Sequence, residues 1–148
     1  MRVLIAGLLL SAASFVHSQQ KGDLEIREPW SRATAPGARV AAGYLEIRNT
    51  GAQPDRLLSA STSVAQRVEL HVTQRDGDVM RMRQVKDLEI PARGRTTLQP
   101  GGTHLMLVDI VRPLKKGERV PLKLRFERSG EVEVELEVRE IGASHHSH

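Results

Sequence analysis

Apolar and polar residues alternate along most of the chain, and this period of two predicts β-strands with one buried and one solvent face. The clearest case is residues 131–138, where glutamate alternates with valine and leucine, so that every glutamate is expected on the solvent face. Residues 104–110 are apolar on both faces, which is typical of a central, buried strand. Further strands are expected at residues 23–26, 40–49, 56–61, 67–73, 79–85, 88–90 and 120–127.

Turns rich in glycine and proline separate these strands at short intervals, and the only helical turn expected is over residues 61–66. Eight or nine short strands without an amphipathic helix predict an all-β fold, a Greek-key sandwich or barrel. The chain has 148 residues, with no internal repeat and no linker, so a single domain is expected.

A β-hairpin is predicted between the strands at 67–73 and 79–85, with Asp76 and Gly77 as its two-residue turn. In this register His71 faces Met82, and directly paired residues have Cβ atoms about 4.5–5.5 Å apart on one face of the sheet. A slip of one residue would put the imidazole and the thioether on opposite faces. Met80 shares the predicted face of Met82, and we expect it to pack or to shield rather than to bind.

His104 and Met106 form a second pair of the same kind, because residues two positions apart in a strand point the same way. The chain has no cysteine. Imidazoles and thioethers without a thiol are ligands that suit a soft metal ion, and copper(I) is the first candidate. Taken singly, each residue is more commonly a solvated histidine or a methionine that fills the core. The fold has to bring the two pairs together.

Together His71, Met82, His104 and Met106 have the spacing H-x10-M-x21-H-x-M, which resembles the periplasmic copper chaperone family known as PCu(A)C. The resemblance extends from about residue 25 to residue 137 and includes Pro36-Gly-Ala38, Ala42-Gly-Tyr44, Ile47-Arg-Asn-Thr-Gly51, Val79-Met-Arg-Met82 and Pro100-Gly-Gly102. It implies a cupredoxin-like fold in which these four residues bind Cu(I). Many members have a further methionine or acidic residue after the first histidine, where this chain has Val72; this departure concerns a fifth contact only.

The resemblance also implies a metallochaperone that receives copper in the periplasm and supplies it for assembly of the CuA centre in subunit II of cytochrome c oxidase. A Sco-type copper chaperone is its expected partner. A blue-copper centre requires a His2Cys set, which a chain without cysteine lacks, so carriage of copper is expected rather than electron transfer. The alternative is a protein that buffers copper or silver with the same ligands and has no dedicated recipient.

No enzyme is expected, because the chain has no nucleophile elbow, metalloprotease helix or phosphate-binding loop. A copper enzyme that chelates through an N-terminal histidine would require cleavage before His17. That cleavage would put Val16 at the last leader position, where a small residue is needed.

Residues 1–18 have the features of a signal peptide: a basic residue, an apolar run too short for a confident membrane span, and small residues. We expect cleavage after Ser18, a copper-binding domain over residues 19–140 and a periplasmic protein. With no cysteine to carry a lipid, no membrane anchor is expected. The net charge of +4 arises from lysines and arginines that alternate with apolar residues, as on the solvent face of strands, so nucleic acid is not an expected partner. A monomer is expected.

The C-terminal segment 141–148 is expected to be a short flexible tail. It contains His145, His146 and His148, which are candidate ligands of a secondary Cu(II) site, because imidazole suits that oxidation state. The alternative is an idle tail or a cloning remnant.

Overall fold

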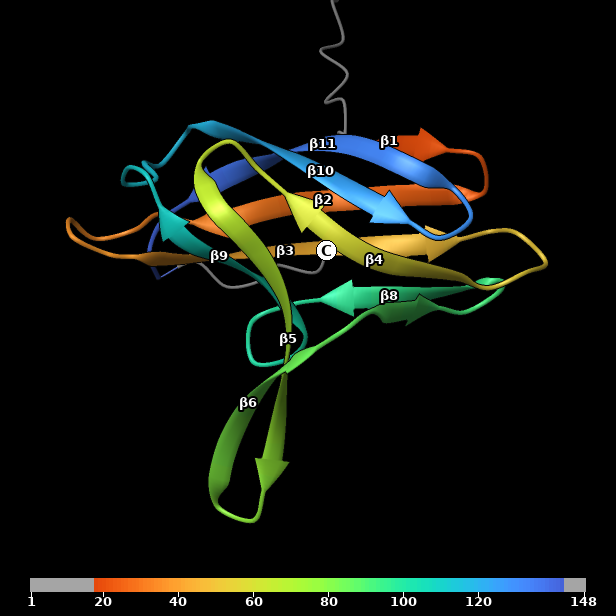
Figure 1. The fold of residues 1–148 in the computed structure, drawn as a ribbon, viewed down its shortest axis with the longest axis horizontal. Coiled ribbons are helices and arrows are strands. Elements are labelled where there is room, and N and C mark those ends of the chain that lie inside the picture. Colours follow the sequence, from red (N-terminus) through yellow and green to blue (C-terminus); the bar gives the residue numbers. More distant parts are fainter. Residues whose placement is uncertain (1–17, 143–148) are drawn as a thin grey trace, which may run out of the picture.

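The computed structural model describes residues 18–142, which form β-strands and no helix (Figure 1). The strands are β1 (Ser18–Lys21), β2 (Leu24–Arg32), β3 (Val40–Asn49), β4 (Asp55–Ser61), β5 (Ala65–Asp76), β6 (Val79–Val85), β7 (Leu88–Ile90), β8 (Gly94–Leu98), β9 (His104–Ile110), β10 (Arg119–Phe126) and β11 (Gly130–Arg139). Eleven strands therefore replace the eight or nine expected. This region also lacks any helix with the length and apolar character needed to cross a bilayer.

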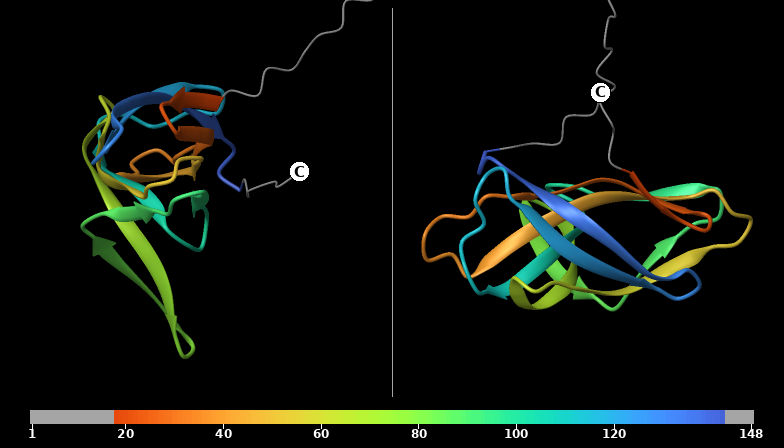
Figure 2. Two further views of the ribbon diagram at one scale, coloured as in Figure 1. Left: turned by 90° about the vertical axis from the view of Figure 1, so that its right-hand side faces the viewer. Right: turned by 90° about the horizontal axis from the view of Figure 1, so that it is seen from above.

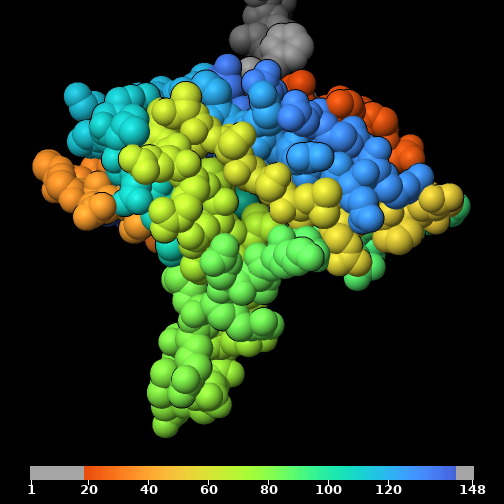
Figure 3. Space-filling model, viewed as in Figure 1, coloured from red at the N-terminus to blue at the C-terminus, as the bar shows by residue number. Residues whose placement is uncertain are grey.

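The strands make one sheet with the order β6-β5-β9-β3-β2-β11-β10-β4-β7, while β1 pairs with β2 and β8 pairs with β3. The sheet curls into a barrel-like body, and the hairpin of β5 and β6 projects from it (Figures 1 and 2). The space-filling view shows the hairpin standing clear of the body (Figure 3). The hairpin therefore has a different environment from the other strands.

Strict alternation explains how the C-terminal strands cover the core. On β10 the residues Val120, Leu122, Leu124 and Phe126 are buried and the residues between them are exposed. On β11 valine and leucine are buried in the same way, and the glutamates face solvent as predicted. Burial of apolar surface on one side of the strands and hydration of charges on the other fix the register of this pair.

Residues 61–66 do not form the expected helical turn. β4 continues to Ser61 and β5 begins at Ala65, so the connection is a short turn. Val64 is buried within this turn, and its carbonyl accepts a hydrogen bond of 2.9 Å from the backbone N–H of Val111. The hydroxyl of Thr62 donates to the carbonyl of Pro121 at 2.7 Å. These bonds, one to the residue that follows β9 and one to β10, take the place of those that a helical turn would make.

At the N-terminal side, β2 is longer than expected and β1 was not expected at all. β2 passes through Pro29 because its pairing with β3 is irregular between Arg27 and Trp30, and proline is tolerated where a ladder bond is absent. Glu28 has a φ of 47° at this point. β1 consists of polar residues without apolar alternation, so no sequence pattern predicted its pairing with β2.

The β5–β6 hairpin has a different turn from the one expected. Asp76 pairs with Val79, so the two loop residues are Gly77 and Asp78 rather than Asp76 and Gly77. Gly77 has a φ of 62°, which suits the first central position of a type II′ turn, where glycine is preferred. His71 consequently pairs with Gln84 rather than with Met82. Moving the turn by one residue shifts the pairing by two, so each side chain keeps its predicted face.

Candidate metal centre

His71 and His104 lie directly opposite each other on the neighbouring strands β5 and β9. Their ring centroids are 5.7 Å apart, and the two ring planes are inclined by only 24°. The residues next to them, Leu70 and Leu105, are buried in the core. Because side chains alternate between faces, both imidazoles lie on the face of the sheet that points away from that core.

The imidazole of His104 is held by the backbone of the preceding turn. Its Nδ1 lies 3.0 Å from the carbonyl oxygen of Gly102, which can only accept a hydrogen bond. His104 is 6% exposed and stands on a strand with neighbours on both sides. Nδ1 therefore carries the proton of the neutral ring, and Nε2 has the free lone pair.

The imidazole of His71 is held by a side chain instead. Its Nε2 lies 2.8 Å from Oε2 of Glu69, two residues earlier on the same face of β5. Its Nδ1 is buried and has no hydrogen-bond partner among the described residues. A buried polar atom without a partner normally has an explanation, such as an ion that it binds.

Glu69 belongs to a chain of ion pairs along this face. Its Oε1 accepts a hydrogen bond of 2.8 Å from Nε of Arg67, whose Nη1 donates to Asp109 at 3.2 Å. Arg39 donates to the other oxygen of Asp109 at 3.0 Å. The bond from Arg67, and after it the bond from His71, lowers the pKa of the Glu69 carboxyl group. Sequence reasoning missed Glu69, although its position two residues before His71 predicts a shared face.

Met106 stands beside the two imidazoles on the same face. It pairs with Glu69 on β5 and with Ala42 on β3, and it is partly buried. Its other neighbours line a shallow hollow of about 290 Å³ formed by small side chains of residues 33–42 and by Arg32. The thioether is therefore accessible from one side of the sheet.

Met82 is the most exposed of the four predicted ligands. It pairs with Thr73, which places it diagonally to His71 on the same face. Diagonal neighbours lie about 7–8 Å apart, within reach of a long side chain. Met82 is 53% exposed and Met80 is 57% exposed, so Met80 is not packed into the core, and a role in shielding the site stays a prediction.

The donor set determines which kind of ion would fit here. Within residues 18–142, no cluster of three or more histidine, cysteine, aspartate and glutamate side chains could hold a metal ion. The face instead carries two imidazoles and the thioethers of Met82 and Met106, with Met80 further along β6, and such donors suit soft ions. Of the other predictions, His145, His146 and His148, together with residues 1–17 of the expected leader, lie outside the described residues.

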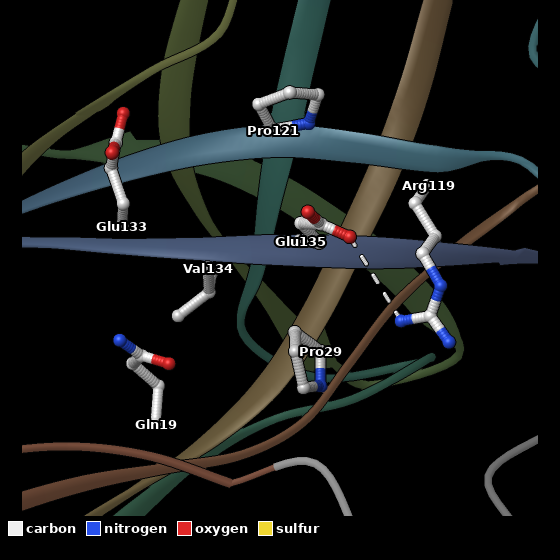
Figure 4. A pocket seen from close by; sticks show the side chains of 7 residues that line it. All are labelled: Gln19, Pro29, Arg119, Pro121, Glu133, Val134 and Glu135. Atoms are coloured by element: carbon white, nitrogen blue, oxygen red, sulfur yellow. Dashed lines mark ion pairs between the residues drawn. The ribbon is translucent and has the colours of Figure 1, made fainter.

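A larger hollow, of about 710 Å³, lies over β10 and β11 (Figure 4). It is lined by Gln19, Pro29, Arg119, Pro121, Glu133, Val134 and Glu135. Figure 4 shows the pairing of Arg119 with Glu135 across it, with a closest distance of 3.9 Å. Its lining has no imidazole or sulfur, so it offers no ligand for a soft metal.

Comparison with solved structures shows which fold this is. The chain matches the copper-bound PCuAC domain from PmoF2 with a TM-score of 0.75 and 29% identity, covering 84% of this chain and 98% of that domain. It matches the solution structure of CuI-DR1885 from Deinococcus radiodurans with a TM-score of 0.66 and 31% identity, covering 86% of this chain and 83% of the other. The prediction of a cupredoxin-like β-barrel is thereby confirmed.

Comparison of sequences gives a consistent answer. A protein named "Putative lipoprotein Lxx21020" from Leifsonia xyli subsp. xyli (strain CTCB07) is 26% identical over 140 residues, which cover 94% of this chain and 83% of that protein. The family described as "Putative lipoprotein LpqE-like" matches residues 24–138, nearly all of the β-structure. The chain belongs to this LpqE-like family.

Proposed function

We propose that this protein binds copper(I) through His71, Met82, His104 and Met106 and carries it as cargo. The observation on which this rests is the direct pairing of the two histidines, with ring centroids 5.7 Å apart and a thioether beside them. Two nitrogen and two sulfur donors suit copper(I) better than they suit hard ions. The similar structures that hold copper, the PCuAC domain from PmoF2 and CuI-DR1885, support this choice of metal.

Exposure of the sulfur donors favours transport over permanent storage. Met82 is 53% exposed and Met106 is partly buried, so a ligand from another protein could replace either thioether while the imidazoles still hold the ion. Thioethers also bind without losing a proton, so only the two histidines have to be neutral. Handover one ligand at a time is the mechanism that this arrangement favours.

We further propose that the recipient is the apo form of cytochrome c oxidase subunit II, reached directly or through a Sco-type chaperone. The compartment is the periplasm, with residues 1–18 as the leader and residues 19–140 as the copper-binding domain. The word lipoprotein in the family description and in the relative's name supports export. A copper or silver buffer without a recipient is the competing proposal.

The tail over residues 141–148 is proposed to bind Cu(II) through His145, His146 and His148. Titration of the full chain and of a chain that ends at residue 140 with Cu(II) tests this directly. A second binding event is expected in the full chain only. Equal stoichiometry in the two chains would contradict a role for the tail.

Competition with a chromogenic Cu(I) chelator tests the main site, and the chain offers a matched pair for it. Met82→Leu and Met80→Leu remove the same sulfur from the same face of β6, at positions of similar exposure. The proposal expects weaker Cu(I) binding in the Met82 variant and in His71→Ala, and unchanged binding in the Met80 variant. Unchanged affinity in His71→Ala would show that the proposed ligands are wrong.

Transfer to a recipient separates the chaperone from the buffer. Copper-loaded protein is mixed with the apo soluble domain of subunit II, with and without a Sco-type protein. Samples are then treated with ferricyanide, which removes one electron from a pair of delivered Cu(I) ions, and the mixed-valence CuA centre is measured by its absorption. A chaperone should deliver copper faster than a small chelator that buffers the same free copper concentration. Delivery at equal rates would favour the buffering function.

A further inference from the structure

Both oxygens of the Glu69 carboxylate are engaged, one by each of two neighbouring side chains. Oε2 lies 2.8 Å from Nε2 of His71, and Oε1 accepts from Nε of Arg67 at 2.8 Å. Arg67 is tied in turn to Asp109. The side chains of Glu69 and His71 are only 19% and 13% exposed. This carboxylate is therefore held by two partners beside the candidate site.

Such a contact decides which nitrogen of His71 carries the proton. A neutral imidazole has one N–H and one lone pair, and a carboxylate can only accept a hydrogen bond. Nε2 must then be the protonated nitrogen, and Nδ1 has the lone pair. Nδ1 is also the atom that is buried without a hydrogen-bond partner in the described part of the chain.

His104 has the opposite arrangement. Its Nδ1 faces the Gly102 carbonyl oxygen at 3.0 Å, so Nδ1 is protonated and Nε2 is free. The two stacked rings thus offer different nitrogens to an ion on their face. The backbone fixes one ring, whereas a replaceable side chain fixes the other.

We propose that Glu69 is a positioning residue that holds His71 in its Nε2–H form, so that copper binds His71 at Nδ1 and His104 at Nε2. The copper part of this inference rests on the proposed function, but the protonation of the metal-free ring does not. A hydrogen-bonded partner of a metal-binding histidine fixes ring orientation and raises its basicity. Glu69→Ala should therefore weaken Cu(I) binding by about 10- to 100-fold.

The first test needs no metal. Protein containing ¹⁵N-labelled histidine is studied by two-bond ¹H–¹⁵N correlation at a pH where both rings are neutral. His71 should show a proton on Nε2 in the native protein and a mixture of the two forms in Glu69→Ala. His104 is the internal control, since its Gly102 contact is untouched by the substitution. A proton on Nδ1 of His71 in the native protein would overturn the proposal.

A double substitution distinguishes positioning from a general effect on structure. In Glu69→Gln the single amide oxygen is expected to turn to Arg67, which leaves the amide N–H₂ facing Nε2 of His71. An N–H₂ group can only donate, so Nε2 has to accept and the ring is driven to its Nδ1–H form. Adding Arg67→Met removes this competitor and frees the amide oxygen for Nε2–H. The Nε2–H form should return in the double variant. No return, with His104 unchanged, would contradict the proposed role.

Addition of Cu(I) to the labelled native protein completes the test. The resonances of Nδ1 in His71 and Nε2 in His104 should move most. Movement of Nε2 in His71 would overturn the positioning proposal while leaving copper binding intact. If neither ring responds to copper, the proposed function fails, although the protonation of His71 could still be as inferred.

Discussion

The two strands that flank β5 have contrasting environments. β9, on one side, is a central strand in which His104 is buried and Met106 is partly buried. β6, on the other side, is the edge of the sheet, and Val79 to Gln84 are all exposed. The candidate site therefore has one half fixed by the core and one half in solvent, with His71 between them. Ordering a solvated methionine side chain costs about 1.5–2 kcal/mol of entropy, which a buried histidine has already lost on folding.

The largest expected effect is on the stability of the buried half. Leu105 is fully buried on β9, between His104 and Met106 but on the core face. Leu105→Ala should lower the free energy of unfolding by about 2–5 kcal/mol, because it leaves a cavity. Denaturant titration measures this, with Met82→Ala as the control, for which a change within about 0.5 kcal/mol is expected at an exposed site. Similar losses in both variants would remove the contrast between the strands.

The next effect is on copper affinity. His104→Ala removes a donor that the fold holds in place. Loss of a residue that only hydrogen-bonds to a metal ligand weakens metal binding by roughly 10- to 100-fold, and the loss of His104 itself should weaken Cu(I) binding by more than that. Met82→Leu should cost less, because the lost bond is offset by the entropy of a side chain that no longer has to be ordered. Competition titration of both variants gives the comparison. A greater loss for Met82→Leu would mean that the hairpin is the principal holder of the ion.

A third effect is a pH dependence of the free energy of unfolding, which we expect to arise from a carboxyl group in the barrel rather than in the hairpin. Asp55 is 5% exposed at the start of β4. Burial raises the pKa of its carboxyl group, but hydrogen bonds from the Ser129 hydroxyl and from the backbone N–H groups of Arg128, Arg56 and Ser129 outweigh this and lower the pKa overall.

Because the pKa is lower in the folded state, this stabilisation is present above the unfolded value of about 3.9 and is lost as pH falls through the folded pKa. Asp55→Asn should cost about 1–3 kcal/mol at neutral pH and should flatten the loss of stability below about pH 4. Thermal unfolding across this range measures both. If Asp55→Asn loses stability below about pH 4 as steeply as the native protein, other carboxylates cause the pH dependence.

The smallest effect is local to the hairpin. Gly77 has a φ of 62° and open space around it, so Gly77→Ala costs only the backbone strain of a left-handed residue, about 1–2 kcal/mol. The amide protons of β6 should exchange with solvent several-fold faster, while those of β9 are unaffected. Hydrogen exchange followed by NMR distinguishes the two strands. Faster exchange in both would show that the hairpin and the body open together.

The contrast also explains what the sequence could predict. The period of two is strongest where one face is buried, so the exposed glutamates of β11 and the central position of β9 followed from it. β1 is polar throughout and is held by backbone pairing, which leaves no periodic signal. The helical turn expected over 61–66 did not form, because burial of Val64 and hydrogen bonds to distant segments override local preference.

The site was predictable in its faces and less so in its register. Asp76 and Gly77 were expected to be the two turn residues of the hairpin, but the turn consists of Gly77 and Asp78, with glycine at the first central position. The pairing of His71 with His104 is a contact between distant segments, which spacing alone does not determine. The role of Glu69 depends on a 2.8 Å contact that only coordinates reveal, even though its shared face with His71 was readable.

The alternation of methionine and arginine on β6 has a consequence for self-association. Met80 and Met82 point to one face of this edge strand, and Arg81 and Arg83 point to the other. An unpaired edge invites the same edge of a second copy, and charged side chains discourage such pairing. Two copies aligned along β6 would bring like guanidinium charges together. We expect the arginines to keep each molecule separate, so that thioethers near an open edge remain available to a different protein.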